Sequence, residues 1–122
     1  GVDKESLLND LNFTGFLFES LVTHDLRVYA QASDAKVFHY CDSSGLEIDA
    51  IVQKYSGEWC AFEIKLGIGQ IEQAAANLHK FVSILDSKKM TPPKSLNVIT
   101  GTGISYTRKD GINVISLASL GA

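Results

Sequence analysis

Residues 46–66 read LEIDAIVQKYSGEWCAFEIKL, and this stretch predicts a hairpin of two β-strands. Both runs, 46–54 and 58–66, contain β-branched or aromatic residues at short intervals, which is typical of strands. The three residues between them, YSG, fit a short hairpin loop in which Gly57 adopts the left-handed backbone conformation. The loop length fixes which residues of the two strands lie opposite each other.

Charged residues interrupt these predicted strands at positions where a buried sheet is usually apolar. Glu47 and Asp49 share one face of the first strand, and Glu63 and Lys65 share one face of the second, because side chains alternate along a strand. The register set by the loop places Asp49 across from Glu63 and Glu47 across from Lys65.

Two ionised carboxylates facing each other across a sheet are unfavourable. At about 5 Å, with an effective dielectric constant near 20, they repel by roughly 3 kcal/mol, whereas a favourable cross-strand pair contributes only about 0.2–1 kcal/mol. Either one carboxyl group is protonated or a cation lies between the two. Mg²⁺ suits such a pair, because one or two carboxylates hold it while it keeps waters and binds phosphate. We therefore expect Asp49 and Glu63 to hold Mg²⁺ or Mn²⁺.

Two further side chains are candidates for the chemistry of such a metal site. Lys65 lies roughly 7 Å beyond Glu63 on the same face, where its ammonium can orient a water or stabilise charge on a phosphoryl group. Glu19 lies beside the apolar stripe of a predicted helix; it either reaches the sheet and adds a metal or water contact or is an ordinary boundary glutamate. Together these residues indicate metal-assisted phosphodiester hydrolysis.

A plainer interpretation of the same residues is an ordinary solvent-exposed face. In that case Glu47 and Lys65 form a surface ion pair across the strands, or Glu63 pairs with Lys65 along its own strand.

The rest of the chain predicts helices before and after the hairpin. In chain order we expect a short helix from Asp3 to about residue 11, a turn at 12–14, a helix at 15–32, a strand at 35–41, the hairpin, a helix at 70–85, and strands at 96–100 and 112–116. The strand–helix–strand step favours a right-handed parallel crossover. The fold class is therefore α/β, with a mixed sheet flanked by two main helices.

Length and composition are those of one globular domain, with 122 residues of which 45% are hydrophobic and 20% charged. Charge breaks every apolar run, which excludes a membrane-spanning helix. The net charge of −3 is not that of a typical nucleic-acid binder. Six basic residues and one acid lie within 80–109, as either a phosphate-contacting patch or a solvated loop. The missing initiating methionine indicates a piece of a longer protein.

Five segments carry a resemblance to known proteins: GFLFESLV (15–22), DSSGLEIDAIV (42–52), AFEIKLG (61–67), AAANL (74–78) and TGTG (100–103). In them the sequence resembles the PD-(D/E)XK nuclease-like superfamily. It resembles more closely the uncharacterised C-terminal domain of many bacterial and archaeal AAA-type ATP-binding proteins. The resemblance implies a restriction-endonuclease-like αβββαβ core spanning residues 1–122.

The resemblance also implies roles for individual residues. The metal-binding acids would be Asp49 and Glu63, the motif lysine Lys65, and the helical accessory acid Glu19. Asn77 stands where exonuclease-like relatives have the tyrosine of a Q-x-x-x-Y motif, which argues against processive exonuclease action.

The expected surroundings are an N-terminal AAA-type ATPase domain in the parent chain, a cytoplasmic location and DNA as a candidate substrate. The first functional hypothesis is a Mg²⁺-dependent nuclease-like phosphodiesterase. The second is a non-catalytic module that binds nucleic acid or protein and regulates the attached ATPase. The complete acid–acid–lysine set favours the first hypothesis, and the low overall basicity favours the second.

Overall fold

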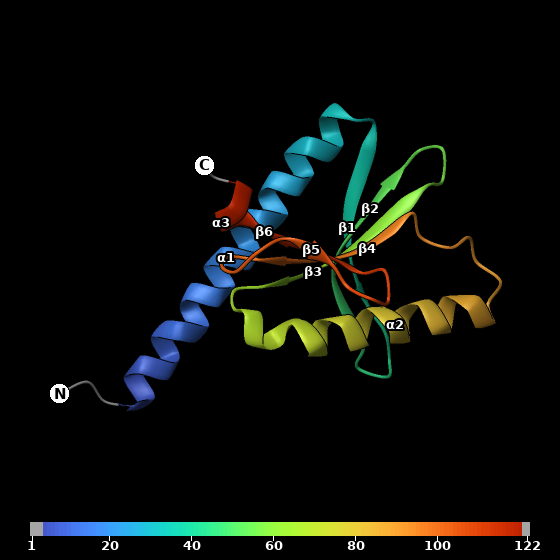
Figure 1. Ribbon diagram of the computed structural model, residues 1–122. Helices are drawn as coiled ribbons and strands as arrows, with labels where there is room; N and C mark the ends of the chain where they lie inside the picture. Colours follow the sequence, from blue (N-terminus) through green and yellow to red (C-terminus); the bar gives the residue numbers. More distant parts are fainter. Residues whose placement is uncertain (1–3, 121–122) are drawn as a thin grey trace.

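A mixed six-stranded sheet lies between two long helices in the computed structural model, which describes residues 4–120 (Figure 1). In chain order the elements are α1 (Lys4–Ala32), β1 (Ala35–Cys41), β2 (Glu47–Lys54), β3 (Trp59–Lys65), the 3₁₀ helix η1 (Ile68–Gln70), α2 (Ile71–Ser87), β4 (Ser95–Thr100), β5 (Tyr106–Thr107), β6 (Asn113–Ser116) and α3 (Leu117–Leu120). The predicted α/β class and αβββαβ order are confirmed.

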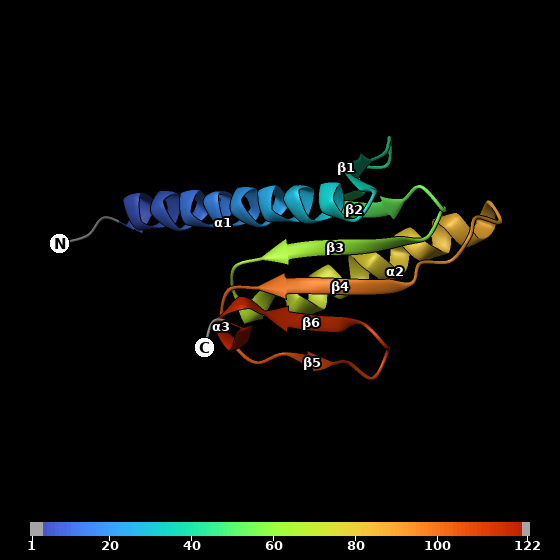
Figure 2. The same cartoon turned by 90° about the horizontal axis from the view of Figure 1, so that it is seen from above.

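The strands follow the order β1-β2-β3-β4-β6-β5 across the sheet. The β1–β2, β2–β3 and β5–β6 pairs are antiparallel, whereas β3–β4 and β4–β6 are parallel. Figure 2 shows β3, β4 and β6 side by side and pointing in one direction. The helix α2 connects β3 to β4, which are parallel neighbours, so the predicted parallel crossover is confirmed.

The central hairpin has the register that its loop predicts. Strands β2 and β3 pair from Ala50 opposite Phe62 to Gln53 opposite Trp59. Gly57 in the loop has a φ of 101°, which favours glycine because a Cβ atom would be strained there.

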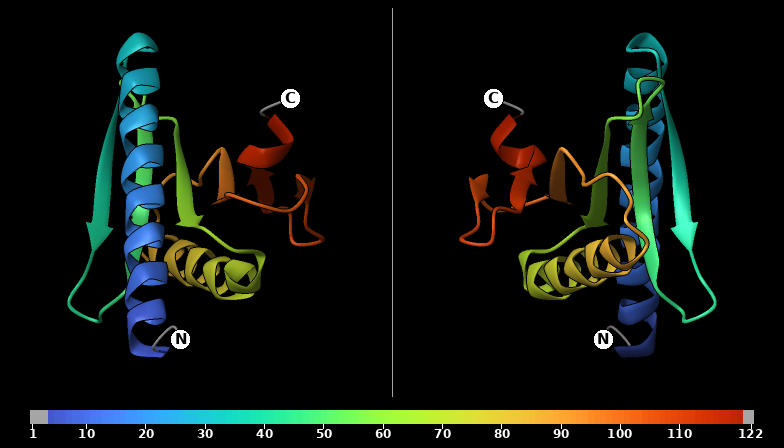
Figure 3. Two further views of the ribbon diagram at one scale, coloured as in Figure 1. Left: turned by 90° about the vertical axis from the view of Figure 1, so that its left-hand side faces the viewer. Right: turned by 90° about the vertical axis from the view of Figure 1, so that its right-hand side faces the viewer.

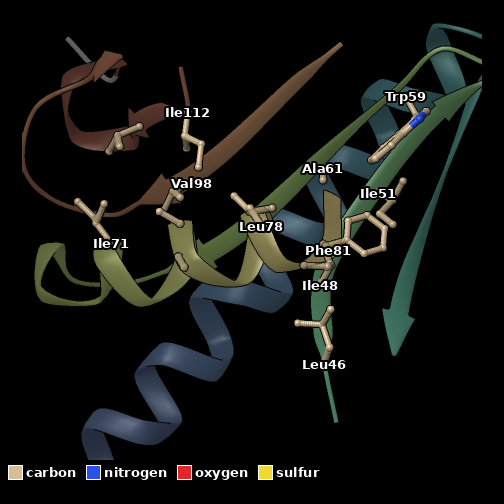
Figure 4. Packing of buried hydrophobic residues seen from close by; sticks show 13 residues of the cluster. Leu46, Ile48, Ile51, Trp59, Ala61, Ile71, Leu78, Phe81, Val98 and Ile112 are labelled. Atoms are coloured by element: carbon tan, nitrogen blue, oxygen red, sulfur yellow. The ribbon is translucent and has the colours of Figure 1, made fainter. Parts of the chain in front are cut away.

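Both faces of the sheet are buried, each against one long helix (Figure 3). The cluster on the α2 face contains Leu46, Ile48, Ile51, Trp59, Ala61, Ile71, Ala74, Ala75, Leu78, Phe81, Val98, Ile112 and Val114 (Figure 4). The smaller cluster on the α1 face contains Val22, Ile64 and Ile99. Neighbouring residues of β4, Val98 and Ile99, fall in different clusters, as strand alternation requires.

The N-terminal helix differs from the prediction. α1 runs without a break through 12–14, where we expected a turn, and Asp3, the expected cap, lies outside the described residues. Asn12, Thr14 and Gly15 are poor helix formers, but even a glycine costs only about 1 kcal/mol inside a helix. Figure 2 shows the first turns of α1 extending beyond the ends of the strands.

None of the helices in the described part of the chain has an apolar stretch long enough for a bilayer crossing.

Candidate active site

The candidate site begins at a bulge in β2. Asp49 and Ala50 together lie opposite a single residue of β1, His39, because the pairing register shifts at this point. As a result Ile48 and Ile51, three positions apart, both pack in the cluster that faces α2. A bulge of this kind bends the strand and re-aims the side chain that it carries.

The bulge places the Asp49 carboxylate between β2 and β3. Regular pairing of the two strands extends only to Ala50 and Phe62. One position further, Asp49 Oδ2 accepts a hydrogen bond from the backbone N–H of Ile64 at 2.8 Å. Asp49 and Glu63 therefore do not form the regular cross-strand pair that we predicted, although their carboxyl groups lie close enough to interact.

Glu63 is a carboxyl group inside the sheet, with only 1% of its surface exposed. Burial, followed by hydrogen bonding and charge repulsion from Asp49, raises its pKa from 4.5 to about 8. Lys65 and a hydrogen bond from Asn77 act in the opposite direction. Asn77 lies on α2 and donates from Nδ2 to Glu63 Oε1 at 3.3 Å.

Lys65 contacts one of these two acids, Asp49. Its Nζ lies 3.9 Å from Asp49 Oδ2, and its side chain is 26% exposed. The predicted pairing of Glu47 with Lys65 is wrong, because β2 leaves β3 beyond the bulge and Glu47 pairs instead with Cys41 of β1. The charged face is thus not a row of regular cross-strand ion pairs.

Glu19 approaches Asp49 from α1, which lies on the other face of the sheet. Burial raises the pKa of Glu19, with further contributions from the charge of Asp49 and from hydrogen bonding to it. Lys65 and His39 partly offset these effects. Glu19 therefore belongs to the charged group around Asp49, which is the geometry expected if it serves the site.

Two hollows open beside these residues, and Lys65 lines both. The first, of about 280 Å³, lies between the β1–β2 turn and α2 and includes Asp49, Glu63, Asn77 and Lys80 in its lining. The second, of about 400 Å³, is lined by Glu19 and by the segment after β3. The structure thus places Asp49 and Glu63 at the first hollow, Glu19 at the second, and Lys65 at both.

The sequence matches the family described as a domain of unknown function (DUF4143) over residues 14–120. The chain belongs to the DUF4143 family. No curated protein and no solved structure matches it. The match covers α1 from residue 14 onward, all of α2 and the whole sheet, so the candidate site lies entirely inside the DUF4143 domain.

Two α2 residues of this DUF4143 domain were not predicted as site residues. Asn77 and Lys80 lie one helical turn apart and both line the first hollow. The Oδ1 atom of Asn77 accepts a hydrogen bond from Gln73 Nε2 at 3.2 Å, which directs its Nδ2 toward Glu63. The sequence signals for these residues are the spacing of Gln73 and Asn77, which we interpret as an incomplete exonuclease motif, and the basic segment 80–109, which begins with Lys80.

The donor set in the DUF4143 domain fits some metals better than others. Among the described residues, no three His, Cys, Asp or Glu side chains are placed to share one ion. Mg²⁺ and Mn²⁺ need fewer protein ligands, because waters and a substrate phosphate complete their shells. The two carboxylates of Asp49 and Glu63 are sufficient for such an ion. They are too few to surround a metal with protein ligands alone.

Proposed function

We propose that this DUF4143 domain is a metal-dependent phosphodiesterase of the nuclease-like class. The proposal rests on one observation: Glu63, 1% exposed, and Asp49 are held within reach of each other, with Lys65 Nζ 3.9 Å from Asp49. A buried pair of acids without a cation or a proton is costly, so an arrangement of this kind needs a ligand or a functional reason.

Asp49 and Glu63 would hold the metal, Mg²⁺ or Mn²⁺. When bound, the ion would supply neutralising positive charge and polarise a phosphoryl oxygen of the substrate. Burial, together with hydrogen bonding to Asp49 and repulsion from it, keeps Glu63 protonated; the charge of the ion would offset these effects, and both acids would be ionised. Metal binding by this domain is therefore expected to release a proton near neutral pH.

Lys65 and Glu19 would contribute to the hydrolysis itself. In that reaction the oxygen of water bonds to phosphorus, the ester P–O bond breaks, and the departing oxygen takes up a proton. The ammonium of Lys65 would stabilise the negative charge that develops on the phosphoryl oxygens. Glu19 borders the second hollow and has a raised pKa, so it could accept a proton from the attacking water.

The proposal includes membership of the PD-(D/E)XK superfamily and an attached AAA-type ATPase domain. The αβββαβ order and the spacing of the two acids and the lysine support the first part. The second part rests on the resemblance to the C-terminal domains of such ATPases.

Calorimetric titration with Mg²⁺ and with Mn²⁺ tests the metal site. The wild-type domain should bind one ion, and Asp49→Ala should abolish binding. Asp86→Ala removes an exposed acid on α2 and is the matched control, which should bind like the wild type. Binding that survives Asp49→Ala would refute the site.

Incubation with plasmid, linear duplex and single-stranded DNA, and with RNA, then tests the activity. Cleavage should require the metal and should be lost in Lys65→Met. Metal binding without cleavage of any of these nucleic acids would instead favour the non-catalytic interaction module, with which the net charge of −3 is consistent.

A further inference from the structure

The α2 side of the first hollow carries the positive charge of Lys80. Lys80 is exposed and lines this hollow together with Asn77, one turn before it. Among the side chains that the structure describes, no carboxylate lies within ion-pair distance of its ammonium, unlike Lys65, which is close to Asp49. An unpaired ammonium beside two acids and an open hollow is suited to an anion that enters the hollow.

The charges around the hollow also limit the size of that anion. Its lining contains three acids, Glu47, Asp49 and Glu63, and two bases, Lys65 and Lys80. With one divalent cation bound and all three acids ionised, the lining has an excess of one positive charge. Glu47 is exposed at the rim and would repel additional phosphates.

In the linings of the two hollows, no basic side chain besides Lys65 and Lys80 extends the positive charge. Lys94 lies 3.7 Å from Glu58, and Arg108 lies 2.7 Å from Glu72; neither base lines either hollow next to the two acids. A protein that holds a long duplex neutralises many phosphates with such residues.

We propose that Lys80 binds the phosphate next to the one that is cleaved, and that the site takes a short single-stranded segment through one or two phosphates. This inference rests on the proposed function, since Asp49, Glu63 and the metal define which phosphate is cleaved. Lys65 and Lys80 each bind one of two neighbouring phosphates, on the two sides of the hollow. A long duplex makes no additional phosphate contacts with the surrounding surface and therefore binds no more tightly.

The probe for the test is a six-nucleotide single-stranded DNA with fluorescein at its 5′ end. Its binding is followed by fluorescence anisotropy in Mg²⁺, before cleavage proceeds, over a series of salt concentrations. The variants are Lys80→Gln, Asp49→Asn and the matched control Lys88→Gln, which removes an exposed lysine at the end of α2.

For the wild type we expect the logarithm of Kd to rise with the logarithm of salt with a slope of about 1.4, the value for two phosphates on a single strand. Lys80→Gln should weaken binding about fivefold to tenfold and reduce the slope to about 0.7. Lys88→Gln should match the wild type, and a duplex of about 20 base pairs should bind no more tightly than the hexamer.

Two results would overturn this inference alone: equal affinities of Lys80→Gln and Lys88→Gln, or a wild-type slope of about 4 or more. In both cases the proposed function would still stand if binding of the hexamer requires Mg²⁺ and is abolished by Asp49→Asn. Binding of the hexamer that ignores both Mg²⁺ and Asp49→Asn would instead refute the proposed function, and the inference with it.

Discussion

Asn77 Nδ2 donates a hydrogen bond to Glu63 Oε1 at 3.3 Å, and Gln73 on the same helix holds the Asn77 amide in that orientation. The amide therefore favours the ionised form of Glu63, while burial and Asp49 favour the protonated form. These opposing effects make Glu63 the group through which pH, metal binding and stability are coupled in this domain.

The stability of the metal-free domain should fall as pH rises toward 8, because Glu63 has a pKa of about 8 in the folded state and about 4.5 in the unfolded state. Between these values the folded state holds the proton and the unfolded state does not, so each rise in pH favours unfolding. The slope is at most about 1.4 kcal/mol per pH unit. Urea unfolding with a chelator present, from pH 5 to pH 9, measures it.

Glu63→Gln should lack this pH dependence, and Asp86→Asn, an exposed acid on α2, should retain it. If the free energies of unfolding of wild type and Glu63→Gln run parallel between pH 5 and pH 8, Glu63 has an ordinary pKa and the coupling to Asp49 is refuted.

Asn77→Leu should raise the pKa of Glu63 further, because it removes an amide that donates to the carboxylate. The protonated form competes with Mg²⁺, and the side chain loses its fixed orientation, so affinity for Mg²⁺ at pH 7 should fall about tenfold. Calorimetry at pH 7 and pH 9 checks this prediction. A deficit that is the same at both pH values would mean that Asn77 acts only on orientation.

The hairpin register could be predicted from the sequence because it depends on local geometry. A three-residue loop with Gly57 at φ 101° leaves few ways to pair the adjoining strands. The proximity of Asp49 and Glu63 followed from that register, although the ladder ends one residue earlier, at Ala50 and Phe62.

The bulge and the contribution of α2 could not be predicted in the same way. The bulge at Asp49 depends on the pairing of β2 with β1, and no residue type in β2 indicates it. The contact of Asn77 with Glu63 spans 14 residues and depends on how α2 lies over the sheet. The predicted turn at 12–14 is wrong, because the free-energy cost of poor helix formers is smaller than the stabilisation from the hydrogen bonds of a continuous helix.

Leu78→Ala should destabilise the domain by about 2–5 kcal/mol, because Leu78 is completely buried between α2 and the sheet (Figure 4). Leu17→Ala on α1 is the control: Leu17 is 50% exposed, so the change should cost less than about 0.5 kcal/mol. Both are measured by urea unfolding. Comparable losses for the two variants would contradict the packing of α2 on this face.

Asp110 should stabilise the contact between α2 and the β5–β6 hairpin in a pH-dependent manner. Its Oδ2 lies 2.8 Å from His79 Nε2 on α2 and 3.2 Å from Arg108 Nε, and its Oδ1 accepts the backbone N–H of Ile112 at 3.1 Å. The hydrogen bond with His79 is the main reason that the pKa of Asp110 falls to about 2, and the bonds from Ile112 and Arg108 add to it.

Because the folded-state pKa of Asp110 lies below its ordinary value of 3.8, its contribution is complete above pH 4 and is lost as pH falls toward 2. Asp110→Asn should therefore reduce the free energy of unfolding by about 1 kcal/mol at pH 6. The effect is this small because the Asp110–His79 pair is partly exposed. Between pH 4 and pH 2 the reduction should become progressively smaller. Urea unfolding of both proteins across this range measures the difference, and added salt should reduce it at pH 6. A difference that stays constant down to pH 2 would show that the ionised form of Asp110 is not what holds the hairpin to α2.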